Sequence, residues 1–187
     1  MTSSDRILMF HKPKGIVVTQ SDELGRKTVY DVLPDWVRTE GWQPVGRLDR
    51  DSRGLLLFVE DPSLIDKLTK PDSIAKIYDV WVRGHVNDNH VLAMKIGVVT
   101  AIGMLKCAEV NTLGVVGPKT HLRVKLFEGK NRQIRRIFGA LHDAEKKTPL
   151  KVLELKRTHF GPLELDLPSG QWRFLNPDEI KNIKELR

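Results

Sequence analysis

A polar loop between apolar stretches carries the first residues that could do chemistry. Residues 46–57 read GRLDRDSRGLLL, so two carboxylates and three guanidinium groups stand before an apolar run. If Asp49 ends a buried strand, the positive charge of neighbouring guanidinium groups would hold its carboxyl in the ionised form. Such a carboxylate can act as a nucleophile or a base without a metal. The alternative is a solvated hairpin loop whose charges pair at the surface.

A second group of residues is strongly basic. Residues 128–136 read EGKNRQIRR, and four of the seven residues from Lys130 to Arg136 are Lys or Arg. Apolar residues at helical spacing predict a helix over 131–142, with these cations in its first turns. The amino end of a helix carries partial positive charge, so cations are unfavourable there unless an anion binds. We therefore expect a phosphate site, with a solvated basic face as the alternative.

The other reactive side chains give weaker signals. The six histidines lack the spacing of a metal site, and Cys107 on a predicted strand is typical of a buried apolar residue. Tyr78 and Trp81 fit a surface that stacks on a nucleic-acid base and fit a core equally well. The sequence has no glycine-rich phosphate loop. We therefore predict neither a metal nor a cofactor.

Composition excludes several classes of protein. Of 187 residues, 40% are hydrophobic and 29% charged, which is typical of a soluble folded chain. The charge-free stretch 96–105 is shorter than the ~18–20 residues of a membrane span. A single cysteine allows no internal disulfide, and the N-terminus does not resemble a signal peptide. We expect a cytoplasmic protein that does not bind membranes.

The positive charge is concentrated in one part of the chain. The formal net charge is +7, and residues 119–159 hold twelve basic and four acidic residues, so the remainder is about neutral. A segregated positive field favours a polyanionic partner such as nucleic acid. The alternative is a solvated basic surface on an ordinary enzyme.

Short strands and helices interleave along the chain. Apolar periodicity predicts strands at 7–10, 16–19, 45–48, 55–59, 76–83, 105–110, 120–127 and 150–160. It predicts helices at 28–33, 62–70, 87–94, 131–142 and 177–186. Short loops join several strand pairs, which favours a mixed, largely antiparallel α+β sheet over a doubly wound parallel one. No linker stands out, so any subdomains must share the sheet.

Five motifs together resemble one enzyme family. The run GRLD followed by SxGLLL resembles the signature of pseudouridine synthases, in the ribosomal small-subunit pseudouridine synthase A branch that modifies ribosomal RNA. Four more stretches resemble the family's motifs in the same order: HKPKG at 11–15, KxY at 76–78, EGKNRQIRR at 128–136 and LKRxxFGPL at 155–163. The resemblance spans residues 7–175.

The resemblance implies a fold and a reaction. The implied fold is an α+β, mostly antiparallel sheet in two subdomains with a central active-site cleft, and residues 1–187 would form this single catalytic domain. The implied reaction isomerises a uridine in ribosomal RNA, with 23S RNA expected, by breaking the base–ribose C–N bond and rejoining the base through carbon 5. The family uses no cofactor for this isomerisation.

The resemblance also assigns roles to individual residues. Asp49 takes the place of the catalytic aspartate, Tyr78 lies against the target base, and Arg135 pairs with the aspartate. The residues expected to contact RNA are Arg47, Arg50, Lys76, Lys130, Arg132, Gln133, Arg136 and Arg157. The motif leaves open whether Asp49 attacks the anomeric carbon, adds to carbon 6 of the base, or acts as a base.

One departure from the family pattern affects RNA binding. Many members carry an N-terminal RNA-binding domain before the KPxG strand, whereas here that strand begins near Ile7. The chain therefore resembles the members without this domain, above all the large-subunit pseudouridine synthase E type. We expect a monomer whose catalytic body binds ribosomal RNA by itself. The alternative is a non-catalytic RNA-binding or ribosome-assembly protein with this fold, which an intact Asp49 disfavours.

Overall fold

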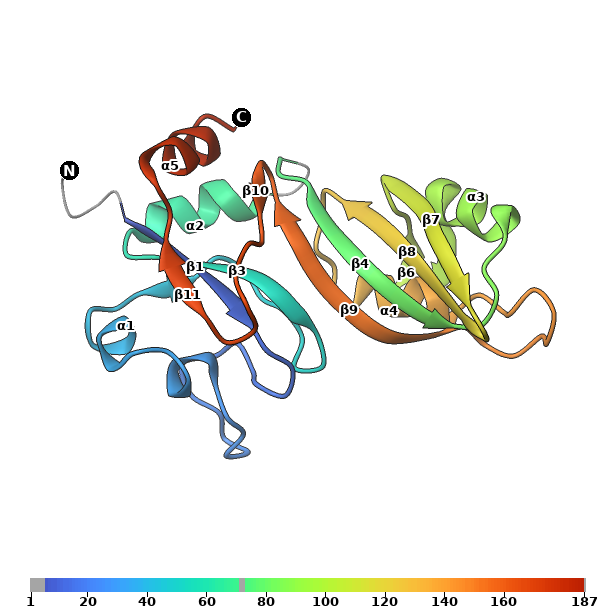
Figure 1. The fold of residues 1–187 in the computed structure, drawn as a ribbon, viewed down its shortest axis with the longest axis horizontal. Coiled ribbons are helices and arrows are strands. Elements are labelled where there is room, and N and C mark those ends of the chain that lie inside the picture. Colours follow the sequence, from blue (N-terminus) through green and yellow to red (C-terminus); the bar gives the residue numbers. More distant parts are fainter. Residues whose placement is uncertain (1–5, 71–72, 187) are drawn as a thin grey trace. The chain divides into compact units, whose positions relative to one another are not determined.

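Two compact units make up the structure, a computed structural model that describes residues 6–70 and 73–186 (Figure 1). The first unit combines Met1–Ile74 with Arg157–Arg187, and the second is Ala75–Lys156. We call them the terminal unit and the central unit. Strand β9 (Lys151–Phe160) crosses the boundary, so its first residues belong to the central unit and its last to the terminal unit.

The terminal unit is built on a sheet that is buried on both faces. Its strand order is β11 (Trp172–Phe174), β1 (Ile7–Lys12), β3 (Arg53–Val59) and the end of β9. The two-residue strands β2 (Gln43–Pro44) and β10 (Leu163–Glu164) pair with β3 and β9. All six residues of β1 are buried. Because side chains alternate across a strand, β1 and β3 contribute to two hydrophobic cores.

The two cores contain different helices. Met9 and Leu57 belong to the core that includes α2 (Pro62–Thr69) and α5 (Pro177–Lys184). Phe10 and Phe58 belong to the core that includes the 3-10 turn η2 (Val29–Asp31) and α1 (Asp35–Thr39). The register places Met9 opposite Leu57 and Leu8 opposite Phe58, so each core is a row of side chains from paired strands.

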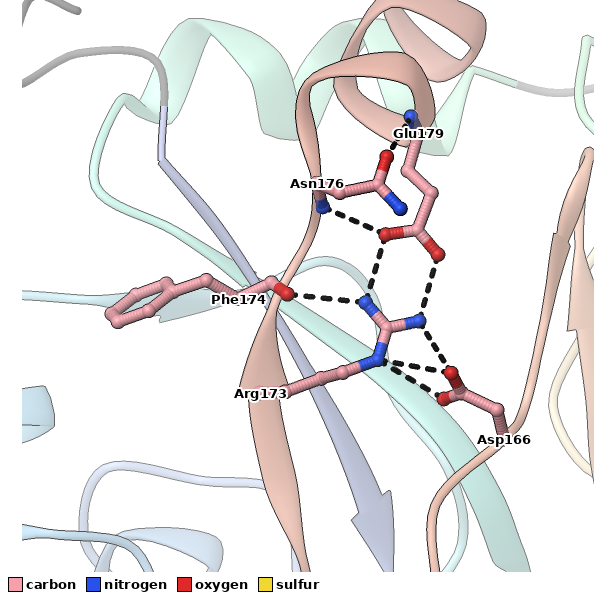
Figure 2. Close-up of polar contacts among 5 residues, drawn as sticks. All are labelled: Asp166, Arg173, Phe174, Asn176 and Glu179. Atoms are coloured by element: carbon pink, nitrogen blue, oxygen red, sulfur yellow. Dashed lines mark hydrogen bonds and ion pairs between the residues drawn. The ribbon is translucent and has the colours of Figure 1, made fainter.

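An ion-pair cluster holds the C-terminal helix on the terminal unit. Figure 2 shows Arg173 of β11 between two carboxylates, with Nη2 2.8 Å from Asp166 and 2.7 Å from Glu179. Its hydrogen bonds to Glu179 and Asp166 raise the pKa of Arg173 above the ordinary value. The amide oxygen of Asn176 accepts from the Glu179 N–H while the Glu179 carboxylate accepts from the Asn176 N–H. This reciprocal cap fixes the start of α5.

The central unit has a sheet that is buried on one face. Its order is the start of β9, β4 (Lys76–Arg83), β8 (Lys119–Leu126) and β7 (Glu109–Val116). Val80 lies opposite Leu122 on the inward face, and both are fully buried. Helix α3 (Asp88–Ile96) contacts β7, and α4 (Gln133–Gly139) contacts the hairpin of β5 (Val98–Thr100) and β6 (Gly103–Leu105).

The predicted fold class is confirmed. Every ladder whose register is described is antiparallel. The strands expected at 76–83, 120–127 and 150–160 and the helices expected at 62–70, 87–94 and 177–186 are present with ends shifted by at most two residues. Among the described residues, no helix is long and apolar enough to cross a membrane.

Several predicted elements were wrong in extent. The strand expected at 45–48 is replaced by β2, because the chain turns at Gly46 with φ +73°. The stretch 16–19 makes only one bridge, from Val17 to Thr28, and the helix expected at 28–33 is the short turn η2. The strand expected at 105–110 is divided between β6 and β7, and the helix expected at 131–142 is the shorter α4.

Candidate active site

A buried lysine fixes the backbone around Asp49. Lys12 at the end of β1 is fully buried, and its Nζ donates to the carbonyl oxygens of Pro13 at 3.0 Å, Asp49 at 3.1 Å and Ser52 at 2.8 Å. An ammonium group has three donor sites, so these bonds replace the water lost on burial. The loop that carries Asp49 is thus held from beneath by one side chain.

The charge of Lys12 lies close to the acidic loop. Burial lowers the pKa of Lys12 to about 8, although the negative charges of Asp49 and Asp51 oppose this shift. The ammonium group is therefore mostly charged at neutral pH. Lys12 supplies the loop with hydrogen bonds and with a positive charge near Asp49.

The turn after Lys12 also holds this loop. The N–H of Gly15 donates to the carbonyl of Arg50 at 2.8 Å, and Nε of Arg50 donates to the carbonyl of Gly15 at 3.2 Å. The N–H of Ser52 donates to the carbonyl of Asp49 at 3.0 Å. Asp49 is half-buried in this frame, while Arg47 is exposed. Of the two arginines expected to contact RNA here, Arg50 already binds the backbone and Arg47 faces solvent.

A close approach of two strands explains the glycine of the GLLL run. Gly54 has φ +122°, and a Cβ atom there would collide with the backbone of Arg157. The Arg157 side chain is buried, with Nε 2.7 Å from the carbonyl of Leu55 and its guanidinium 5.5 Å from the ring centre of Phe160. This burial does not support the expected contact of Arg157 with RNA, and its visible role is to join β9 to β3.

In the central unit, Lys76 and Tyr78 lie on the inward face of β4. Tyr78 is 8% exposed and lies opposite Val124 of β8. Lys76 is also 8% exposed, and its Nζ donates to the carbonyl of Phe127 at 3.0 Å. Lys76 was expected to contact RNA, but this burial makes it a backbone anchor for the segment that follows β8. The contact of Tyr78 with a target base stays a prediction.

Gln133 frames the segment between β8 and α4. Its Oε1 accepts from the N–H of Lys130 at 3.1 Å, and its Nε2 donates to the carbonyl of Lys106 at 2.9 Å and to Glu128 at 2.8 Å. The Glu128 carboxylate also pairs with Nζ of Lys130 at 3.0 Å. Gln133 is 3% exposed. An expected RNA contact is therefore a buried organiser of the loop.

The helix whose first turns were expected to bind phosphate begins later than predicted, and the phosphate contact itself stays a prediction. Helix α4 has seven residues and begins at Gln133, so Lys130 and Arg132 precede it. Arg132 adopts a left-handed conformation, φ 49° and ψ 32°, which interrupts the helix that apolar spacing predicted over 131–142. The N–H of Lys130 donates to the side chain of Gln133, which closes this segment. Arg132 is exposed and remains a candidate for RNA contact.

The two arginines inside α4 are held differently. Nη1 of half-buried Arg135 donates to the carbonyl of Val152 at 3.3 Å, within the central unit. Arg136 binds Asn131 twice, with Nε 3.0 Å from the carbonyl and Nη2 2.9 Å from the side-chain oxygen. Arg136 was expected to be free for phosphates, whereas it supports the turn before α4. The pairing of Arg135 with Asp49 stays a prediction.

Comparison with known proteins decides the family. Residues 6–140 match the family described as RNA pseudouridylate synthase. The chain belongs to this family. The resemblance to pseudouridine synthases is thereby confirmed, and two similar relatives carry the name of the B type rather than the E type.

The relatives of this pseudouridylate synthase family member are longer than the chain. Ribosomal large subunit pseudouridine synthase B of Haemophilus influenzae is 34% identical over 97% of this chain and 49% of the relative. The Vibrio vulnificus protein of the same name is 35% identical over 97% and 55%. The chain thus spans about half the length of these curated relatives. A crystal structure of a pseudouridylate synthase matches with a TM-score of 0.82 and 27% identity over 95% of this chain and 73% of that one.

Lys12 is a candidate site residue that the sequence analysis did not identify, and several residues expected to contact RNA are buried. Lys12 lies in the quoted HKPKG motif, yet its bonds to the Asp49 loop were not foreseen. Among the described residues, no three His, Cys, Asp or Glu side chains gather as metal ligands would. The chemistry that the site can offer is that of a carboxylate held beside a buried ammonium group.

Proposed function

We propose that this chain isomerises a uridine of ribosomal RNA, in the 23S molecule, to pseudouridine, with the Asp49 carboxylate as the reacting group. The observation that carries the proposal is the Lys12 ammonium, which bonds to the carbonyls of Asp49 and Ser52 at 3.1 and 2.8 Å and so fixes the loop. Two relatives are named ribosomal large subunit pseudouridine synthase B, which supports the choice of RNA.

The reaction needs no external reactant. The bond between C1′ and N1 breaks, the base turns, C5 bonds to C1′, and the proton of C5 is lost while N1 gains one, so all atoms are conserved. The target atoms are inaccessible in a stacked helix, so the uridine must be flipped out. The Asp49 carboxylate serves one of three steps: attack on C1′, addition to C6, or removal of the C5 proton. A fixed backbone serves each step because all of them need an oriented oxygen.

Exposed cations hold the RNA backbone in this proposal. Arg47 precedes Asp49 in the terminal unit, and Arg132 precedes α4 in the central unit; both side chains are exposed. Phosphate contacts of this kind position the RNA without reading its sequence. Tyr78 would contact the flipped base through its ring, which is worth ~1–3 kcal/mol in other proteins.

Replacement of the carboxylate tests the proposal. Asp49→Asn keeps the shape of the side chain and removes its charge. Release of tritium from C5-labelled uridine in 23S RNA should fall by several orders of magnitude, while RNA affinity changes by less than about tenfold. Undiminished turnover of Asp49→Asn would exclude this mechanism. An unsubstituted protein that binds 23S RNA but releases no tritium would instead be the non-catalytic RNA-binding protein.

A further inference from the structure

Two aromatic rings face outward from the sheet of the central unit. Trp81 lies opposite His121, and the rings stack with centroids 4.3 Å apart and planes 3° apart. Both are half-exposed, on the face opposite the buried Val80–Leu122 pair. These rings therefore lie outside the core, on a surface that the candidate active site does not use.

The next strand leaves space beside this stack. Strand β7 places Gly114 opposite His121, and a Cβ atom added to Gly114 would meet no atom within 4 Å. Neighbouring strands lie about 4.8 Å apart, which is close to the 4.3 Å between the two rings. A flat ring placed over Gly114 would thus continue the row of Trp81 and His121 at stacking distance. We call these three positions the stacking row.

A pair of like charges lies next to the stacking row. Arg83 and Lys119 are directly opposite in the register, and both side chains are exposed. Like charges at opposed positions destabilise a sheet, and neither cation forms an ion pair with any residue that the structure describes. On the same face, Asp79 and Arg123 are a matched pair at 3.1 Å. The mismatch is therefore local, and an anion would relieve it.

A loop at residues 143–147 carries two further cations and is bonded to the chain that follows Arg83. The Asp143 carboxylate accepts from the N–H groups of His85 and Lys146, each at 2.8 Å, which ties the loop to the chain two residues after Arg83. Hydrogen bonds from these N–H groups lower the pKa of Asp143 to about 2, so its carboxyl is ionised at neutral pH. Lys146 and Lys147 are exposed on this loop.

We propose that this surface binds a single-stranded segment of the substrate RNA, with a base on His121 over Gly114 and phosphates on Arg83, Lys119, Lys146 and Lys147. The inference rests on the proposed function for the identity of the RNA, and it adds a contact away from the reacting uridine. An unpaired base has an open face that can stack on the row. When the cations contact phosphates, counterions condensed on the RNA are released, which favours binding.

Two substitutions are expected to weaken RNA binding without destabilising the sheet. Gly114→Val puts a β-branched side chain where the base would lie and suits a strand. Arg83→Glu gives Lys119 an opposite charge across the strands. Both variants should unfold at the temperature of the unsubstituted protein or above. Each should bind a labelled single-stranded RNA of about 12 nucleotides at least about fivefold more weakly at low salt.

Matched controls separate this site from general charge and from the proposed function. Thr112→Val on β7 and Lys95→Glu on α3 should keep RNA affinity within about twofold. Unchanged affinity in Gly114→Val and Arg83→Glu would overturn the proposal and leave an acidic protein as the partner, whereas a loss in Arg83→Glu alone would overturn the stacking. Asp49→Asn should bind this RNA normally, so failure of the proposed reaction would leave the result intact.

Discussion

A charged side chain anchors one functional segment, and a neutral side chain anchors the other. In the terminal unit, the Lys12 ammonium donates to three carbonyl oxygens around Asp49. In the central unit, the Gln133 amide bonds to the N–H of Lys130, the carbonyl of Lys106 and the carboxylate of Glu128. The two side chains are 0% and 3% exposed. They make equally many bonds, but only Lys12 brings charge to the segment that it holds.

The charge of Lys12 and the neutrality of Gln133 predict different effects on the reaction and on the structure. A buried charge acts strongly on nearby ionised groups because water does not screen it. A neutral amide fixes geometry and leaves the local potential almost unchanged. We therefore expect changes at Lys12 to act mainly on the reaction of Asp49, and changes at Gln133 to act mainly on stability and RNA binding.

Among changes to the two anchoring side chains, the largest effect is expected from Lys12→Met. Methionine fills similar space but leaves the carbonyls of Pro13, Asp49 and Ser52 without this donor, so the Asp49 loop can shift. A displacement of about 1 Å can cost roughly 100-fold in rate, so single-turnover isomerisation should fall by at least that factor. RNA affinity, measured by filter binding, should stay within about threefold because the exposed cations are unchanged.

Lys76→Met is the matched control for that change. It also removes a buried ammonium group, but one that donates to the Phe127 carbonyl, in the segment after β8, and not to the Asp49 loop. Its isomerisation rate should fall by about tenfold or less, because a net hydrogen-bond contribution of ~1 kcal/mol is lost outside the Asp49 loop. Equal losses of rate in Lys12→Met and Lys76→Met would show that the link from Lys12 to Asp49 has no special role.

An intermediate effect is expected from Gln133→Met. The carbonyl of Lys106, the carboxylate of Glu128 and the N–H of Lys130 would each lose a partner, so the free energy of unfolding in urea should fall by about 1–3 kcal/mol. RNA affinity should weaken with it because Lys130 and Arg132 lose their fixed positions. Normal stability with strongly reduced turnover would instead place Gln133 in the chemistry.

Local patterns were enough to predict most regular elements. Strand β8 alternates apolar and polar residues along its length, and Asn87 and Asn176 mark the starts of α3 and α5. The start of α4 after Arg132 was not predictable from sequence. The left-handed conformation of Arg132, φ 49°, interrupts the helix there, and arginine has no preference for that conformation. The pattern of Ile134, Ile137 and Phe138 indicates which face is buried but not where the helix begins.

Site residues were harder to interpret than the fold. A lysine is rarely fully buried, so sequence alone favours exposed, RNA-binding roles for Lys76 and gives Lys12 no role. Both depend on contacts between distant parts of the chain, such as the 37 residues that separate Lys12 from Asp49. The resemblance identified the family, while the roles that it assigns to single residues stay predictions.

The smallest expected effect is a pH dependence. Burial lowers the Lys12 pKa from 10.5 to about 8, so the charged fraction and the single-turnover rate should fall about fourfold from pH 7 to 8.5. Stability should move the other way. The folded chain binds fewer protons than the unfolded chain between about pH 8 and 10.5, so the contribution of this group to the free energy of unfolding rises with pH over that window.

Lys12→Met should show neither of these pH trends. Single-turnover rates and urea unfolding, both measured from pH 7 to 9.5 on the two proteins, give the comparison. A falling rate with rising stability, absent from the variant, requires the charge of Lys12 for the reaction. A rate that stays level to pH 9 in the unsubstituted protein would show that the reaction needs the hydrogen bonds of Lys12 but not its charge. Lys12 and Gln133 would then differ in the segment that they hold and not in the effect of charge.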